Sequence, residues 1–315
     1  MQTRPLSEVS SRDLRALLEE ESGYWSEELL WDYSEVCSAV AAGLDRGTLT
    51  GRVLQDGPRS LAYCYYMMDT GRAIVGSLFA AAPFRGQGLE EGLLEAVLSE
   101  AQSRPGSDRV ECQTLFSTAR DADRRFQRAG FAGRRRHYLI RGLDEALATS
   151  ASSFRLRPLR REDLPTAARI IHRSHQGSLD AALNMTYATL ASCRGFVDTL
   201  VLRSGCGRFD VDASMVAEDE KGAVGVVLSS HLSSTNGHLC QVSVAPEAQS
   251  RGLGTALVAA ALDAFRRRGL KTASLSVTVD NERAYALYGR LGFHLRKEFA
   301  AHAWVRPPAR IDLPA

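Results

Sequence analysis

The chain has 315 residues, which exceeds the usual length of a single domain and allows two domains, each with its own core. Its 44% of hydrophobic and 24% of charged residues are typical of a soluble globular protein and exclude a disordered or collagen-like chain. A formal net charge of +2 lacks the basic excess that nucleic-acid binding needs, so we expect no nucleic-acid partner.

The six cysteines are scattered without a CxxC pair or any metal-ligand spacing. We therefore expect reduced thiols, no bound metal and a cytoplasmic location. The first residues, MQTRPLSEVSSRDL, lack the apolar core of a signal peptide, and no run approaches the roughly 18 apolar residues of a membrane span. We expect no membrane partner, and the chain is compatible with a monomer or a homodimer.

The first half contains the helical stretch ESGYWSEELLWDYSEV near its start. Trp25 and Trp31 in this stretch have the spacing of core aromatics, but they could also line an acceptor cleft. From Pro83, the segment PFRGQGLEEGLLEAVLSEA predicts a Gly-rich turn that leads into an amphipathic helix. The string RRFQRAGF ends at Phe131, and the short basic run that follows it is expected to be a solvated strand edge or loop.

Residues 143–153, LDEALATSASS, end in small polar residues that are typical of a linker, so we place a boundary near Ser152. The next segment predicts a strand in which Phe154 and Leu156 alternate, followed by a helix that begins at Leu164 and is capped by Asp163. We therefore predict one domain over residues 1–150 and a second over residues 153–315.

The run LCQVSVAPEAQSRGLG predicts a buried strand that stops before Pro246, then a Gly-rich turn into a long helix. Gly252 and Gly254 let the backbone approach a ligand closely, and the first N–H groups of a helix have no internal partners. Such a turn can bind an anion, here a pyrophosphate, although it could equally serve only to pack the helix on the strand.

Two other nucleotide-binding loops do not fit this turn. A dinucleotide fingerprint GxGxxG would need glycine or alanine at position 257, where the chain has Leu257. A Walker loop would need a Gly-Lys-Ser/Thr sequence, which the turn lacks.

The turn and its helix occur twice in the chain. The separation in sequence between Arg85 and Arg251, in the two turns, is nearly the same as that between Phe131 and Phe293, which ends ALYGRLGF. Two similar separations in the same order indicate a tandem repeat.

The second turn resembles the signature Gln/Arg-x-x-Gly-x-Gly/Ala of the GNAT superfamily, the acyl-CoA-dependent N-acyltransferases. Gln249, Gly252 and Gly254 match its fixed positions. The downstream string VTVDNERAYALYGRLGF resembles the second conserved region of the family, with matches at Asn281, Ala284, Leu287, Tyr288, Gly292 and Phe293.

The resemblance implies an α/β (α+β) fold class: two tandem GNAT folds, each a central mixed, mostly antiparallel twisted sheet flanked by helices. It also implies an N-acetyltransferase in which a primary amine of a small-molecule or peptide acceptor attacks acetyl-CoA directly. Acetyl-CoA would be a co-substrate, and no metal would take part.

The resemblance further implies a set of site residues. Tyr288 would be the general acid, since a phenol with a pKa of about 10 is protonated at neutral pH; the alternative is a packed aromatic. The backbone of residues 242–244 would pair with the pantetheine arm and supply the oxyanion donor. Cofactor contacts would come from Val242, Ser243, Val244, Gln249, Ser250, Arg251, Gly252, Leu253, Gly254, Thr255, Asn281 and Tyr288.

His238 is the candidate for the general base. Counting back from Val244 in steps of two places Val242, Cys240 and His238 on one strand face, a register that resembles family members whose base begins this strand. An imidazole pKa of about 6.5 suits neutral pH, although a histidine after Asn-Gly could also lie in an exposed turn. The other candidates for the base are His231, Glu218, His172 and His175.

The first copy departs from the family pattern. Pro83 stands where the family has Gln or Arg, and the separation between Phe131 and Phe293 aligns Ala119 with Asn281 and Phe126 with Tyr288. We therefore expect residues 1–150 to form a degenerate GNAT-like domain without catalysis, with one active site per chain in residues 153–315. Its surviving glycines leave open whether it still binds acyl-CoA.

Two other functions remain open. A non-catalytic acyl-CoA sensor would need the cofactor loop but not Tyr288 and Asn281, and a protein N-terminal acetyltransferase would need a peptide groove. The tandem architecture resembles that of the mycothiol synthase family, which does not carry over a substrate. Acceptor loops in this fold come from the variable region, here residues 171–206, which contains no legible specificity pattern.

Overall fold

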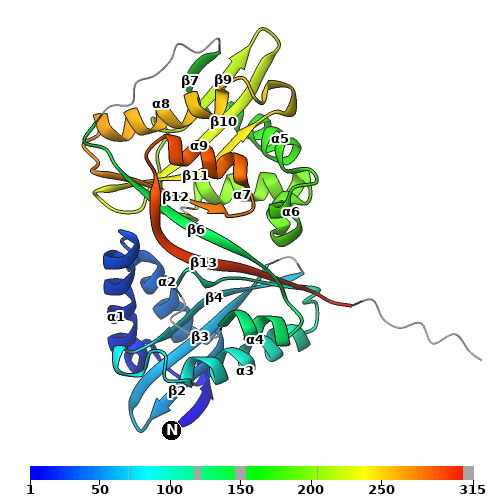
Figure 1. The fold of residues 1–315 in the computed structure, drawn as a ribbon. Coiled ribbons are helices and arrows are strands. Elements are labelled where there is room, and N and C mark those ends of the chain that lie inside the picture. The colour runs from blue at the N-terminus through cyan, green and yellow to red at the C-terminus, as the bar shows by residue number, and fades with distance from the viewer. Residues whose placement is uncertain (70, 117–121, 146–153, 204, 308–315) are drawn as a thin grey trace, which may run out of the picture. The chain divides into compact units, whose positions relative to one another are not determined.

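The structure, a computed structural model, describes residues 1–69, 71–116, 122–145, 154–203 and 205–307 (Figure 1). It contains two compact units. The N-terminal unit comprises Met1–Gly23, Ser34–Arg134 and Ala300–Ala315, and the C-terminal unit comprises Tyr24–Tyr33 and Arg135–Phe299. The predicted boundary near Ser152 lies outside the described residues. Of the described helices, none combines the length and apolarity that a membrane crossing requires.

The C-terminal unit is built on a mixed sheet of strand order β6-β12-β11-β10-β9-β7. Only the β11–β12 pair is parallel among the described neighbours of this sheet. The strands are β6 (Ala132–Gly142), β7 (Arg155–Pro158), β9 (Met215–Asp219), β10 (Gly222–His231), β11 (Asn236–Val244) and β12 (Thr272–Thr278), with the short β8 (Arg208–Phe209) beside β10.

Helices cover both faces of this sheet, as the alternation of buried side chains along β10 requires. Helix α8 (Leu253–Arg267) lies on one face, and α5 (Leu164–His175) and α7 (Leu190–Leu202) lie on the other (Figure 1). Val227 packs into the cluster under α8, whereas Val226 and Leu228 pack into the cluster under α5 and α7. The unit also contains α6 (Leu179–Leu183), α9 (Glu282–Arg290), and the short 3₁₀ turns η4 (Arg161–Asp163), η5 (Met185–Tyr187) and η6 (Pro246–Ala248).

The N-terminal unit repeats this plan with the strand order β1-β2-β3-β4-β5-β13, in which β4 and β5 are parallel. Both sheets are mixed and mostly antiparallel, which confirms the predicted fold class. The elements are β1 (Gln2–Pro5), η1 (Leu6–Glu8), α1 (Ser11–Leu29), α2 (Ser34–Asp45), β2 (Thr50–Asp56), β3 (Arg59–Asp69), β4 (Arg72–Ala80), η2 (Ala82–Phe84), α3 (Leu89–Ser103), β5 (Arg109–Gln113), η3 (Thr114–Phe116), α4 (Ala122–Arg128) and β13 (His294–Val305).

Each sheet takes one strand from the other half of the sequence. In the C-terminal unit, residues 136–142 of β6 pair with β12, and in the N-terminal unit, residues 301–305 of β13 pair with β5. The segment Tyr24–Tyr33 also belongs to the C-terminal unit. No single cut of the chain therefore separates the two compact units. The assignment of a degenerate domain to residues 1–150 and a catalytic one to residues 153–315 stays a prediction.

The two copies repeat the path from strand to helix residue by residue. An extra residue bulges from each strand, Gly76 in β4 and Cys240 in β11, and a left-handed glycine caps each following helix, Gly88 for α3 and Gly252 for α8. The separation in sequence between Gly76 and Cys240 equals that between Gly88 and Gly252. It is slightly shorter than the separation between Arg85 and Arg251, on which the predicted alignment of the two turns rested.

This register corrects the sequence alignment of the first loop. Arg85, and not Pro83, corresponds to Gln249, because the two side chains make the same contact. Arg85 Nε donates to the Ala80 carbonyl at 2.9 Å, and Gln249 Nε2 donates to the Val244 carbonyl at 3.1 Å. The first copy therefore keeps the leading position of the family signature.

Further along the chain, the predicted alignment of Phe131 with Phe293 is confirmed. Phe131 N donates to the Phe126 carbonyl at 2.9 Å, and Phe293 N donates to the Tyr288 carbonyl at 3.0 Å, so Phe126 is the equivalent of Tyr288. Ala119, the predicted equivalent of Asn281, lies outside the described residues.

Candidate functional site

A cavity of about 630 Å³ lies in the C-terminal unit at the carboxyl ends of the parallel strands β11 and β12. The pairing of these strands ends at Leu239 and Leu275, whereas β11 continues to Val244 and β12 to Thr278. The cavity is lined by the end of β11, the loop before α8, the end of β12, α9 and the segment after α5.

The loop before α8 supplies one wall, and the predicted contact residues Gln249, Ser250, Gly252, Leu253, Gly254 and Thr255 line it. Gly252 has φ of 77° and Ser250 of 62°, so both adopt the left-handed region that a side chain disfavours. The unpaired N–H groups and the positive dipole end of α8 favour an anion there.

The side chain of Gln249 connects strand and helix. Its amide nitrogen contacts the end of β11, and its Oε1 accepts a hydrogen bond from Arg283 Nη1 at 2.9 Å. Arg283 and Arg290, on α9, both line the cavity and were missed by the sequence analysis. Their spacing of two helical turns places both on the same face of α9 and was the available signal.

Arg251 lies elsewhere. Its guanidinium carbon is 4.5 Å from the centre of the Phe154 ring, and the residue is not among the described residues that line the cavity. Among the described residues, the guanidinium groups that border the cavity are instead those of Arg283 and Arg290.

Three other predicted contact residues, Val242, Ser243 and Val244, line the cavity from β11. Ser243 is buried and its hydroxyl accepts from Gln241 Nε2 at 2.9 Å. Asn281 lines the cavity from the start of α9, where its Oδ1 accepts from Ala284 N at 3.2 Å. The asparagine thus caps α9 and orders the helix that carries Tyr288.

Tyr288 is partly buried in the wall of this cavity. Burial, assisted by the nearby Tyr187 and Asp180, raises the pKa of Tyr288 well above its ordinary value. The phenol is therefore protonated throughout the neutral range, as a proton donor requires.

A second group lies at the end of α5 and in the segment that follows it, and its members His175 and Asp180 line the cavity. The His175 ring stacks on Tyr187, with centroids 4.0 Å apart, and Tyr187 Oη donates to Gln241 Oε1 at 3.0 Å. Asp180 Oδ1 accepts from Thr278 Oγ1 at 2.5 Å. Burial raises the pKa of Tyr187 to about 12 and lowers that of His175. Asp180 carried no motif in the sequence, because the fold alone brings it to this wall, and Tyr187 supports the wall from behind through His175.

His238 is buried, and it is not among the described residues that line the cavity. It is 6% exposed, its Nδ1 is 3.0 Å from Ser274 Oγ, and the rings of Trp31 and Tyr138 flank it. Burial, with the nearby Arg136 charge, lowers its pKa to about 4.

The prediction that His238 shares a strand face with Val242 and Val244 is wrong. The bulge at Cys240 breaks the alternation of β11, so Val242 and Val244 pack against the α8 cluster while Cys240 packs against the α5–α7 cluster. Gly237, the neighbour of His238, faces Phe265 of α8, which places His238 on the opposite face. Its role as the base stays a prediction.

The other candidate bases are engaged in contacts of their own. Glu218 forms an ion pair with Arg157 at 2.7 Å, and His172 Nδ1 is 3.4 Å from the Tyr187 carbonyl.

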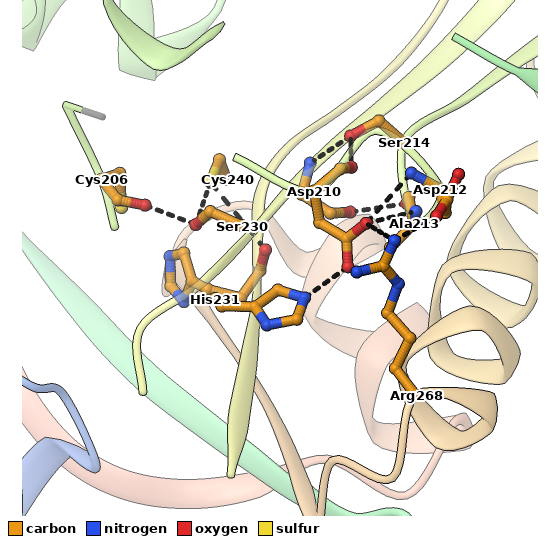
Figure 2. Close-up of polar contacts among 11 residues, drawn as sticks. Cys206, Asp210, Asp212, Ala213, Ser214, Ser230, His231, Cys240 and Arg268 are labelled. Atoms are coloured by element: carbon orange, nitrogen blue, oxygen red, sulfur yellow. Dashed lines mark hydrogen bonds and ion pairs between the residues drawn. The ribbon is translucent and has the colours of Figure 1, made fainter. Parts of the chain in front are cut away.

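Figure 2 shows the fourth candidate, His231, in a network around the buried carboxylate of Asp210. Asp210 Oδ1 accepts from the backbone N–H groups of Asp212 at 3.0 Å and Ala213 at 3.1 Å, and Oδ2 contacts His231 Nε2. Arg268, at the end of α8, pairs with Asp210 and with Asp212. The network joins the loop before β9 to α8 and lies outside the described cavity lining.

The loop of the N-terminal unit contains an anion of its own. Glu90, at the position of Gly254, is fully buried, and its Oε2 accepts from Gly86 N at 2.8 Å. Gly86 has φ of 66° and corresponds to Ser250. A carboxylate thus contacts the backbone amide that in the second copy borders the cavity.

Residues 196–293 match the model of the acetyltransferase (GNAT) family. A mycothiol acetyltransferase of Acidimicrobium ferrooxidans is 35% identical over 117 residues, which cover 36% of this chain and 38% of that protein. The mycothiol acetyltransferase of Streptomyces bingchenggensis is 37% identical over 128 residues, covering 40% of this chain and 36% of that protein. The chain therefore matches well under half the length of these relatives.

Solved structures extend the likeness in fold to nearly the whole chain. A tandem GNAT protein from the clavulanic acid biosynthesis pathway superposes with a TM-score of 0.61 at 14% identity, covering 98% of this chain and 99% of that one. A GCN5-related N-acetyltransferase from Sphaerobacter thermophilus gives a TM-score of 0.64 at 21% identity, covering 84% and 82%. Residues 196–293 therefore match the acetyltransferase (GNAT) family, and the fold of the chain is that of two tandem GNAT units.

Proposed function

We propose that the chain is an acetyl-CoA-dependent N-acetyltransferase that acts on a primary amine of a small-molecule or peptide acceptor. The observation that carries this proposal is a single cavity lined by the anion-binding loop, the end of β11 and Tyr288.

The cavity suits the separate parts of acetyl-CoA. The N-terminus of α8 and the guanidinium groups of Arg283 and Arg290 favour the phosphates. Beyond Leu239, β11 has no described partner on its β12 side, so its backbone groups there can pair with the amides of the pantetheine arm. One N–H of this edge, within residues 242–244, would stabilise the oxyanion.

The reaction requires one bond to form and one to break. The acceptor nitrogen attacks the thioester carbonyl, the new C–N bond forms, and the C–S bond breaks to release the CoA thiolate. Tyr288 is the proton donor to that thiolate, and its raised pKa keeps the phenol protonated at neutral pH before the reaction. The proton of the acceptor ammonium must leave to a base, for which His238 is the prediction from sequence.

We place one active site in each chain. In the N-terminal unit, Phe126 replaces the acid and Glu90 occupies the loop, so this unit has a structural role. Two kinds of relative favour the two acceptor classes, a small molecule and a peptide terminus. The first are the mycothiol acetyltransferases. The second is the N-alpha-acetyltransferase 30 of Schizosaccharomyces pombe, which is 34% identical over 84 residues that cover 25% of this chain and 56% of that protein.

The test is release of CoA thiol by the purified chain from acetyl-CoA, with a panel of primary amines that includes amino sugars, cysteine-linked amines and short peptides. Turnover that depends on one class supports the proposal and names the acceptor. Tight acetyl-CoA binding without turnover on any amine would favour the sensor and refute the enzyme.

A further inference from the structure

We infer that His175 Nε2 accepts the proton from the attacking amine of the acceptor. This assignment rests on the proposed acetyl transfer. His175 is the last residue of α5, and the described residues lining the cavity of Tyr288 include no other histidine. His175 therefore borders the same cavity as Tyr288, in which the thioester and the acceptor would meet.

The hydrogen bonds of His175 determine which ring nitrogen can accept a proton. Its Nδ1 is 2.9 Å from the Ile171 carbonyl and 3.0 Å from Ser174 Oγ, whose own hydroxyl donates to the same carbonyl at 2.9 Å. A carbonyl oxygen can only accept, so Nδ1 must carry the hydrogen. The lone pair of the neutral ring is then on Nε2, which none of these contacts occupies.

The orientation of the ring is held by its neighbours. His175 and Tyr187 stack with an interplanar angle of 10°, and the Tyr187 hydroxyl is anchored to Gln241. Gln241 lies on β11 directly after the bulge and next to Val242 in the cavity wall. The stack thus couples the imidazole to the strand that would hold the pantetheine arm, an arrangement that keeps a base in a fixed position.

The charges around His175 allow it to be neutral at neutral pH. Burial disfavours the protonated ring and is the largest effect, whereas the hydrogen bond to the Ile171 carbonyl and the charge of Asp180 on α6 favour it. Tyr187 of η5 and Tyr288 of α9 are neutral phenols, and Arg173 of α5 is paired with Glu247 of η6 at 2.8 Å. The net direction is a pKa below the ordinary value of about 6.5.

With His175 as the base, each proton of the acetyl transfer has a donor and an acceptor. An ammonium proton passes to Nε2, the neutral amine forms the C–N bond, and the C–S bond breaks as Tyr288 protonates the thiolate. The second proton on nitrogen leaves as the amide forms and restores the Tyr288 phenol. After product release, the imidazolium gives its proton to solvent, so one proton is released in each turnover. The enzyme ends in its starting protonation state.

The deciding experiment compares His175→Gln with His238→Gln, using the primary amine identified by thiol release. We expect His175→Gln to lower kcat/KM by about 100-fold or more and to abolish the acid limb of its pH profile, with acetyl-CoA Kd by calorimetry within about twofold. Imidazole added to His175→Ala should restore part of the rate. His294→Gln, at an exposed position of β13, is the control and should leave the profile unchanged.

An acid limb that persists in His175→Gln, or that disappears only in His238→Gln, overturns the inference. Either result leaves wild-type acetyl transfer in place. A wild-type chain that transfers acetyl to no amine instead overturns the proposed function, so the two failures are distinguishable. Unchanged acetyl-CoA binding in each variant shows that the fold of the site has survived the substitution.

Discussion

Glu90 and Gly254 occupy the same position in the two copies of the fold, two residues after the left-handed glycine that caps α3 or α8. In the N-terminal unit the Glu90 carboxylate accepts a hydrogen bond from Gly86 N–H. In the C-terminal unit Gly254 has no side chain that could reach Ser250, and both residues line the cavity. One side chain thus distinguishes a filled anion loop from an open one.

Gly254→Glu should therefore abolish acetyl-CoA binding. The new carboxylate would reach the Ser250 amide as Glu90 reaches that of Gly86, and it would repel the cofactor phosphates. We expect Kd to rise by about 100-fold or more, equivalent to about 2.7 kcal/mol, measured by calorimetry on the purified chain.

Gly254→Ala is the matched control for this substitution. A Cβ at this position would lie 3.2 Å from Leu287 Cδ1, the end of a flexible side chain that can move, so binding should weaken only slightly. Unaltered binding in Gly254→Glu would mean that the loop is not the phosphate site.

Tyr288→Phe should lower kcat by about 100-fold or more and leave acetyl-CoA Kd nearly unchanged, because it removes the proton donor and keeps the ring. The neighbouring tyrosine of α9, Tyr285, has its hydroxyl 3.0 Å from His137 Nδ1 and supplies the control Tyr285→Phe. Equal losses in both variants would assign the effect to α9 packing and not to proton transfer.

Asp210→Ala should destabilise the C-terminal unit by about 3 kcal/mol at pH 7, because it leaves two backbone N–H groups and the partly buried His231 without their acceptor. The measurement is urea unfolding followed by tryptophan fluorescence in a Trp304→Phe background, which leaves Trp25 and Trp31 of this unit as the probes.

The stabilisation by Asp210 should depend on pH in a defined direction. Burial raises its pKa, but the hydrogen bonds from His231 and Ala213 and the Arg268 charge outweigh burial, so the folded pKa lies below the ordinary value. The contribution is therefore present above the unfolded pKa of about 4 and is lost as pH falls through the folded pKa. Asp212→Ala, at an exposed position, should change stability by less than about 1 kcal/mol. A difference between wild type and Asp210→Ala that grows on acidification would contradict this account.

Gly237→Ala should lower the stability of the same unit by about 1 to 3 kcal/mol, because the added Cβ would lie 2.6 Å from ring atoms of Phe265. Gly195→Ala, in the exposed part of α7 with no atom within 4 Å of the new Cβ, should instead raise stability by about 1 kcal/mol. Differential melting temperatures of the two variants check the pair, and equal shifts would refute the packing argument.

The local path around the Gly-rich loop before α8 could be predicted from sequence because each step rests on neighbouring residues. Pro246 ends a strand, Gly252 permits the left-handed turn, and the apolar spacing after Gly254 makes a helix whose face is buried as expected. Asn281 and Tyr288 followed from a second short motif, and the structure brings both to the same cavity as the loop.

Other features depended on partners far away in the chain. The bulge at Cys240 moves His238 to the opposite face from Val242, a change of one residue that no period-two count reveals. The corrected alignment that matches Arg85 with Gln249 became visible only through their hydrogen bonds to equivalent carbonyls. His175, Asp180 and Tyr288 line one cavity because α5, α6 and α9 pack at the same end of the sheet.

The sequence by itself therefore determined the repeated turn, its helix and the motif that carries Tyr288, since side-chain spacing within a few turns of chain sets each of them. Tertiary structure decided which strands complete each sheet, where Glu90 places its carboxylate and which histidine reaches the cavity. These outcomes depend on hydrogen-bond register and packing between segments far apart in the chain, which local spacing does not encode.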